Sequence, residues 1–169
     1  MDVLKAAQIV HEEGIAIPIL LGNKATIDDL RAAINFDDEV EIIDPKEEAH
    51  KAQRDHYADL FWKDQRRKGY TLYDAPRLMR ERNYYASMMI KNGDADAMIS
   101  GYSRNYRSVV KPILETISKA KGVSRVAATN LMLTKSGPLF LSDTTINVDP
   151  TAKELAKIAQ MTANTSKLF

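Results

Sequence analysis

Hydrophobic positions follow two different spacings along the chain. Apolar residues three or four apart, together with helix start and stop signals, predict helices at 3–13, 26–34, 46–68, 71–80, 83–92, 104–120 and 150–168. Short apolar runs predict strands at 17–21, 40–43 and 97–100, and a turn between two further runs predicts a hairpin of residues 126–134 and 138–142. Strands that alternate with helices are typical of a mostly parallel sheet covered on both faces, so the sequence predicts an α/β fold.

Short motifs predict where individual helices begin. Thr26 and Thr71 are each followed three residues later by Asp, as in a capping box, in which two side chains bond each other's backbone N–H groups. Asp149 and Pro150 fit the N-cap and the first position of the last helix. Pro112 lies inside a predicted helix, where proline removes one backbone hydrogen bond.

The predicted hairpin interrupts the alternation of strands and helices, so we expect a boundary after Gly122, between subdomains at 1–122 and 123–169. The chain begins with a predicted helix, whereas parallel α/β domains usually begin with a strand, and it ends inside a predicted helix. We therefore expect a partial domain from a longer protein. The sheet edge left by a missing first strand should be covered by a second copy, in a homo-oligomer.

Composition restricts the classes of function. Hydrophobic residues make up 44% of the 169 residues, enough for a core. A net charge of +1, from 24 basic and 23 acidic residues, argues against a nucleic-acid partner or a basic membrane surface. The absence of cysteine excludes disulfides and zinc–thiolate sites. No apolar run reaches the roughly 20 residues of a membrane span, and the first residues lack a signal-peptide pattern, so we expect a cytoplasmic protein.

The strongest candidate for chemistry is the segment where the predicted strand at 97–100 leads into a helix. Ligands of open α/β sheets bind at such strand ends, and the free N–H groups of a helix start attract phosphate. The basic residues of this helix are spaced at i, i+3 and i+7, on one face. The residues expected to contact an anion are Ser100, Gly101, Arg104, Arg107 and Lys111. The alternative is a solvated basic face that pairs with acids such as Glu115.

A second candidate is the loop between the hairpin and the last helix, where Asp143 and Thr144 could line a cleft between subdomains. Ordinary turn and cap chemistry is the alternative for these two residues. The three histidines show no metal-ligand spacing, so no metal site is expected. The chain has no Walker loop, no dinucleotide-binding glycine motif and no nucleophile elbow, and we assign no catalytic residue or nicotinamide site to it.

Six stretches in order carry a family resemblance. They are residues 3–10 with 13–15, residues 18–22, residues 85–89 with 93–96, residues 98–101, residues 111–112, and residues 143–152 with 154–156. Together they resemble the phosphotransacetylase family, the phosphate acetyl- and butyryltransferases. Residues 100–106 and 137–141 are most similar to the version fused behind bacterial NADP-dependent malic enzymes. Working acetyltransferases tend to carry a Gly-Ala-x-His turn, where this chain has Gly101, Tyr102, Ser103 and Arg104.

The resemblance implies a three-layer α/β/α fold of the phosphotransacetylase and isocitrate-dehydrogenase type, with a cleft between two subdomains. In working members, arginines bind acetyl phosphate and an Asp is proposed to deprotonate coenzyme A. One such arginine falls on Lys111 here and another near Gln65 or Arg66. The Ser-Arg pair and the Asp of the family lie in a half that this chain does not contain. The resemblance therefore implies no transfer activity in this piece alone.

The malic-enzyme version implies an assembly and regulatory domain with acetyl-CoA as its effector, in a parent that uses NADP and Mg²⁺ or Mn²⁺. Two alternatives stay open. One is a fragment of an active phosphate acetyl- or butyryltransferase. The other is a purely structural oligomerisation domain that binds no ligand.

Overall fold

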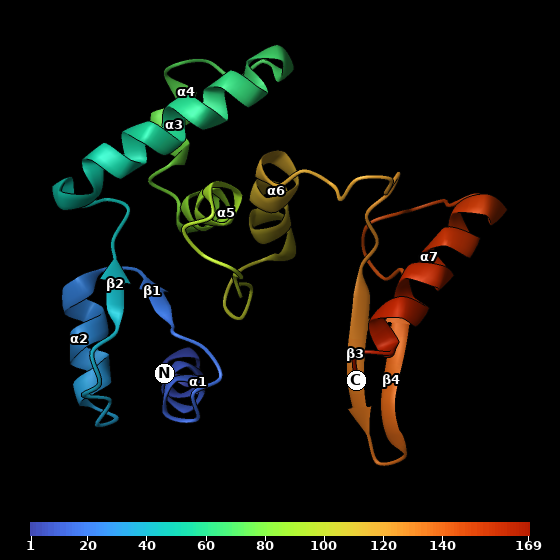
Figure 1. Ribbon diagram of the computed structural model, residues 1–169, viewed down its shortest axis with the longest axis horizontal. Coiled ribbons are helices and arrows are strands. Elements are labelled where there is room, and N and C mark those ends of the chain that lie inside the picture. The colour runs from blue at the N-terminus through green and yellow to red at the C-terminus, as the bar shows by residue number, and fades with distance from the viewer. The chain divides into compact units, whose positions relative to one another are not determined.

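A computed structural model describes all residues from 1 to 169 (Figure 1). The chain divides into two compact units, Met1–Ser118 and Lys119–Phe169. The sequence placed a subdomain boundary a few residues later, after Gly122.

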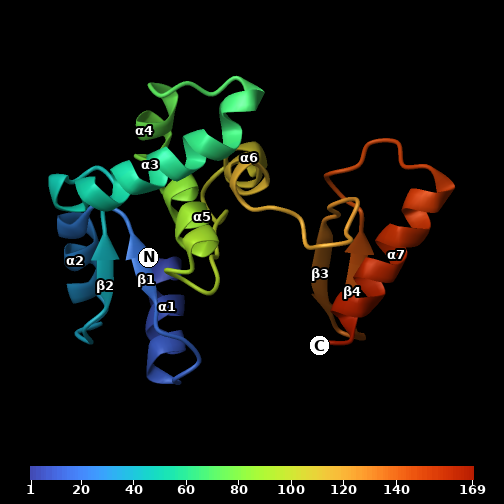
Figure 2. The ribbon, with the colours of Figure 1, turned by 45° about the horizontal axis from the view of Figure 1, so that its top comes forward.

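The first unit contains a small parallel sheet and six α-helices. Its elements are α1 (Asp2–Glu12), β1 (Ile19–Leu21), α2 (Lys24–Ala32), β2 (Glu41–Ile43), α3 (Lys51–Gln65), α4 (Asp74–Leu78), α5 (Arg82–Asn92) and α6 (Tyr106–Thr116). Short 3₁₀ turns precede and follow α3, at Glu48–His50 and Arg66–Lys68. In the sheet, β1 pairs in parallel with β2, and Leu20 lies opposite Ile42. The helix α5 packs against both α3 and α6 (Figure 2).

The two faces of this sheet are buried against different helices, because side chains alternate along a strand. Leu20 and Ile42 pack into a cluster that also contains Leu4 of α1 and Leu30 of α2. Ile19, Leu21 and Ile43 face the opposite way, into a cluster built from α3, α4 and α5. The sheet thus lies between two helical layers, which confirms the predicted α/β fold with helices on both faces.

Aromatic and methionine side chains form the larger of these clusters. Tyr57, Tyr85 and Met88 are fully buried, and the rings of Tyr57 and Tyr85 meet edge to face at 5.1 Å. The Phe61 ring makes the same kind of contact with Tyr84, at 5.7 Å. Aromatic and methionine residues of α5 thus supply much of this core.

The starts of two helices test the predicted capping boxes. The expectation for Thr26 is wrong: α2 begins two residues earlier, because the side chain of Asn23 accepts the backbone N–H of Thr26 at 3.0 Å. For Thr71 both expected hydrogen bonds are present, although α4 itself begins three residues later, at Asp74. The Thr71 hydroxyl accepts the N–H of Asp74 at 3.1 Å, and the Asp74 carboxylate accepts the N–H of Thr71 at 3.0 Å.

The single helix predicted at 46–68 is interrupted near its start. Residues 44–47 instead form a turn in which the Asp44 carboxylate accepts the N–H of Lys46 at 2.9 Å. Arg54 of α3, only 5% exposed, donates to the carbonyl oxygens of Pro45 and Glu47 at 2.9 and 3.0 Å. Because these carbonyl groups bond a side chain, the α-helix begins later, at Lys51.

The strand predicted at 97–100 is wrong. These residues are irregular, and the side chain of Ile99 is fully exposed. The only strand partner of β1 is β2, so no neighbouring strand supplies hydrogen bonds to this segment. An apolar run alone does not make a strand, since strand pairing requires a partner backbone.

The second unit consists of an antiparallel hairpin and one helix. β3 (Thr129–Thr134) pairs with β4 (Gly137–Ser142), and α7 spans Ala152–Ser166. The hairpin is confirmed, but the prediction of Asp149 and Pro150 as the helix start is wrong. Thr151 is the N-cap, and it forms a capping box with Glu154 that fixes the start two residues later. Across the chain, no helix is long and apolar enough to cross a membrane.

Candidate functional site

The segment from Ser100 into α6 holds most of the predicted anion ligands. Gly101 has a φ of +119°, a backbone conformation that other residues rarely adopt. The Asn105 side chain caps α6 by accepting the N–H of Ser108 at 2.9 Å, so the helix begins at Tyr106. Arg104 therefore precedes the helix, and the prediction of three cations on one helix face is wrong.

Asn83 of α5 joins the two ends of this segment. Pro112 has no N–H to bond the Ser108 carbonyl one turn earlier, and the Asn83 side-chain amide donates to that oxygen instead, at 3.0 Å. The Asn83 side-chain oxygen accepts the Ser100 hydroxyl at 2.8 Å. Sequence reasoning missed this role of Asn83. Its signal is Pro112, because a proline inside a helix leaves a carbonyl group that needs another donor.

The three predicted cations differ in their surroundings. Arg104 and Arg107 are exposed, and neither forms an ion pair or a side-chain hydrogen bond. Lys111 lies one turn beyond Arg107 on the same face of α6, and its ammonium is 3.7 Å from the carboxylate of Glu115. The alternative interpretation, a basic face whose residues pair with nearby acids, therefore holds for Lys111 but not for Arg104 and Arg107.

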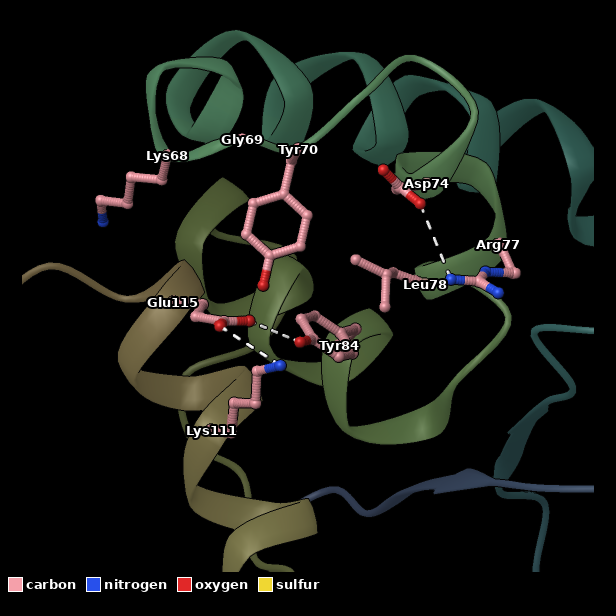
Figure 3. A pocket seen from close by; sticks show the side chains of 9 residues that line it. All are labelled: Lys68, Gly69, Tyr70, Asp74, Arg77, Leu78, Tyr84, Lys111 and Glu115. Atoms are coloured by element: carbon pink, nitrogen blue, oxygen red, sulfur yellow. Dashed lines mark hydrogen bonds and ion pairs between the residues drawn. The ribbon is translucent and has the colours of Figure 1, made fainter.

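A cavity of about 400 Å³ opens beside Lys111, between the last turn of α6 and the loop that follows α3 (Figure 3). Its lining is strongly polar. The charged and aromatic residues around it are Lys68, Tyr70, Asp74, Arg77, Tyr84, Lys111 and Glu115. The basic side chains suit an anion and the tyrosine rings can contact an apolar or aromatic group, so the cavity can accept a ligand that combines both.

Glu115 is the most connected side chain in this cavity. Its carboxylate accepts the hydroxyl of Tyr84, and its main-chain carbonyl accepts the side-chain amide of Gln65 at 2.5 Å. Burial, and then the nearby Glu115 carboxylate, raise the pKa values of both Tyr84 and Tyr70, so the two phenols stay protonated. The two tyrosines were missed as site residues, because their apolar neighbours favour a role in the core.

The structure separates the roles of Gln65 and Arg66. Gln65 is buried, with 6% of its surface exposed, and anchors the end of α6 through Glu115. Arg66 is exposed and lies over the ring of Trp62, 5.5 Å from its centre. Neither side chain lines the cavity.

In the second unit, Asp143 organises its own loop. Its carboxylate accepts the backbone N–H groups of Ala128 at 2.9 Å and Asn147 at 2.8 Å, and it also accepts the Asn147 side-chain amide. Partial burial acts to raise the pKa of Asp143, but these hydrogen bonds outweigh it and lower the pKa to about 2. Thr144 is exposed. The contacts of Asp143 are those expected from turn and cap chemistry.

The model of the family described as Phosphate acetyl/butaryl transferase matches residues 1–169. The chain belongs to this family. The match confirms the resemblance carried by the six stretches.

Individual relatives support this assignment. A phosphotransacetylase structure from Streptococcus pyogenes matches with a TM-score of 0.83 and 35% identity, over 98% of this chain and 50% of that one. The phosphate acetyltransferase of Thermoanaerobacterium thermosaccharolyticum is 34% identical over 97% of this chain and 51% of the relative. A probable NADP-dependent malic enzyme of Rickettsia prowazekii is 28% identical over 98% of this chain and 22% of the relative. The chain thus spans about half or less of the proteins it matches.

Proposed function

We propose that this chain is a regulatory and assembly domain of a cytoplasmic NADP-dependent malic enzyme, and that it binds acetyl-CoA without transferring the acetyl group. The parent protein converts malate to pyruvate and CO₂ with NADP and Mg²⁺ or Mn²⁺, using residues outside this chain, and its subunits form a homo-oligomer. The residues proposed to contact the effector all lie in the first unit, and they are Ser100, Gly101, Arg104, Arg107 and Lys111.

The observation that carries this proposal is the pair of arginines beside the start of α6. Arg104 and Arg107 are exposed and have no carboxylate partner, although elsewhere on the chain many basic residues pair with acids one turn away. Guanidinium groups bind phosphate through paired hydrogen bonds, and helix starts add unbonded N–H groups. The several phosphate groups of a coenzyme A ester match such a cluster.

Two further observations favour a sensing role over catalysis. The arginine that working relatives use is a lysine here, Lys111, which keeps the charge but loses the planar pair of donors. Its ammonium also faces Glu115 within the protein. The malic enzyme of Rickettsia prowazekii shows that a protein of that name contains a region similar to this chain.

An acetyl-CoA titration of the complete parent enzyme tests the proposal, with inhibition of malate oxidation as the readout. We expect Arg107→Ala and Lys111→Ala each to weaken inhibition about ten-fold or more, because a hydrogen bond to a charged group contributes about 1.5–3 kcal/mol. Lys5→Ala, which removes an exposed lysine of α1, is the matched control and should leave inhibition unchanged. Unchanged inhibition in both test variants would contradict the proposal. Equilibrium dialysis that detects no acetyl-CoA binding would support a purely structural domain instead.

An active acyltransferase is the second candidate, because several of the relatives carry the name phosphate acetyltransferase. A parent of this kind would form acetyl-CoA from acetyl phosphate and coenzyme A. The assay follows thioester formation by the complete parent protein. Turnover that falls in Lys111→Ala would replace the sensing proposal with this one, whereas no thioester above the rate without enzyme supports sensing.

A further inference from the structure

Glu115 is held in one position at the cavity by contacts from two sides. One carboxylate oxygen accepts the hydroxyl of Tyr84, a residue that is only 6% exposed. The main chain of Glu115 is tied to the buried Gln65 at 2.5 Å. The Glu115 side chain is 22% exposed, less than half as much as that of Lys111 at 54%. Because both anchors are buried, Glu115 is much less free to turn into solvent than an ordinary acid on a helix surface.

The second carboxylate oxygen of Glu115 faces Lys111. Its distance from the ammonium is 3.7 Å, and Figure 3 shows the lysine directed toward the carboxylate at the edge of the cavity. Most exposed ion pairs of this spacing are weak, since both side chains are mobile and solvated. Here the Glu115 side chain is already fixed, so formation of the ion pair costs less conformational entropy than it does between two mobile side chains.

An anion that approaches Lys111 meets a carboxylate already in place. The Glu115 carboxylate and an anionic ligand repel each other when both lie beside the ammonium of Lys111. This repulsion is stronger where water is partly excluded. We propose that Glu115 is a built-in competitor for the anionic ligand at Lys111, and that it lowers the affinity of this site. Glu115 acts here through its ion pair with Lys111.

This inference rests on the proposed function, because it takes Lys111 to be a ligand of the acetyl-CoA phosphates. It adds a residue that sets the effector concentration at which the site fills. A lower affinity raises the acetyl-CoA concentration at which half of the sites are filled.

Isothermal titration of the complete protein with acetyl-CoA, at constant ionic strength, tests this role. The variants are Glu115→Gln, Lys111→Met and the double variant. Glutamine keeps the size of the side chain and still accepts the Tyr84 hydroxyl, so the fold is preserved, and thermal unfolding checks this. Asp64→Asn is the control for general charge, since Asp64 pairs with Lys91 and lies outside the cavity.

We expect Glu115→Gln to tighten acetyl-CoA binding about three- to five-fold, as the loss of a competing surface ion pair implies. Asp64→Asn should leave the affinity unchanged, and Glu115→Gln should have no effect once Lys111 is Met. A purely structural Glu115 would give weaker or unchanged binding instead.

The two proposals fail in different ways. If Lys111→Met weakens binding but Glu115→Gln does not tighten it, the competitor role is overturned and the proposed function stands. If Lys111→Met leaves the affinity unchanged, the assignment of Lys111 as a ligand is overturned, and the competitor role with it.

Discussion

Replacement of Asn83 by alanine removes the side-chain donor to the Ser108 carbonyl and the acceptor of the Ser100 hydroxyl. Pro112 cannot replace the lost donor, because it has no N–H. Each hydrogen bond contributes about 0.5–1.5 kcal/mol, and the higher helix propensity of alanine offsets about 0.5 kcal/mol. We therefore expect Asn83→Ala to reduce the free energy of unfolding of the first unit by about 1–2 kcal/mol, and Tm by about 4–8 °C.

A double-mutant cycle isolates the proposed cause. In Pro112→Ala, residue 112 regains an N–H that can bond the Ser108 carbonyl within the helix, so Asn83 is no longer needed as a donor. Asn83→Ala should then cost about 1 kcal/mol less in the Pro112→Ala background than in the wild type. Urea unfolding followed by circular dichroism measures all four proteins. An equal cost of Asn83→Ala in both backgrounds would refute the link between the proline and the asparagine.

Three further predictions concern other parts of the chain. The pKa of Asp143 is about 2 in the folded protein, against a usual value of 3.8. The ionised carboxylate therefore stabilises the second unit above about pH 4, and this contribution is lost as the pH falls through about 2. Asp143→Asn should abolish that pH dependence in urea unfolding between pH 2 and 5, and an unchanged pH profile would contradict it. Thr151→Ala removes the N-cap of α7 and should cost about 1 kcal/mol, measured by thermal unfolding, whereas exposed Thr165→Ala at the other end of the helix should cost less. Arg54→Leu leaves the carbonyl groups of Pro45 and Glu47 without their buried donor, and it should lower the free energy of unfolding by about 2–3 kcal/mol. Urea unfolding measures this loss, with Arg80→Leu, at an exposed arginine, as the control. A smaller loss for Arg54→Leu than for the control would be inconsistent with this role.

The spacing of apolar residues predicted most helices and the parallel pair of strands correctly, because burial of one face is visible locally. It failed at 97–100, where the apolar run has no neighbouring strand to pair with. The exact helix starts also differed, since residues outside the periodic pattern, Asn23 and Thr151, provide the caps. These caps are short-range features, and they were missed because Thr26 and Asp149 offered equally plausible alternatives.

The candidate site could be predicted only in part. Lys111 was named from its charge and spacing, and it does line a cavity. Its surroundings depend on contacts between distant positions, such as Gln65 with Glu115 and Tyr84 with Glu115. The link between Asn83 and Ser108 has the same long-range character. No periodic pattern encodes such pairs, because they form only when α3, α5 and α6 pack together.

The central claim is that the segment from Ser100 to Lys111 binds a phosphorylated ligand, and backbone amide NMR tests it most directly. Titration of acetyl-CoA into ¹⁵N-labelled protein should shift the amide signals of Arg104, Arg107 and Lys111 together, with one saturating affinity. The same titration with inorganic phosphate should shift a subset of these signals at higher concentration. Signals that stay in place at saturating acetyl-CoA, or that move only in other parts of the chain, would contradict the account.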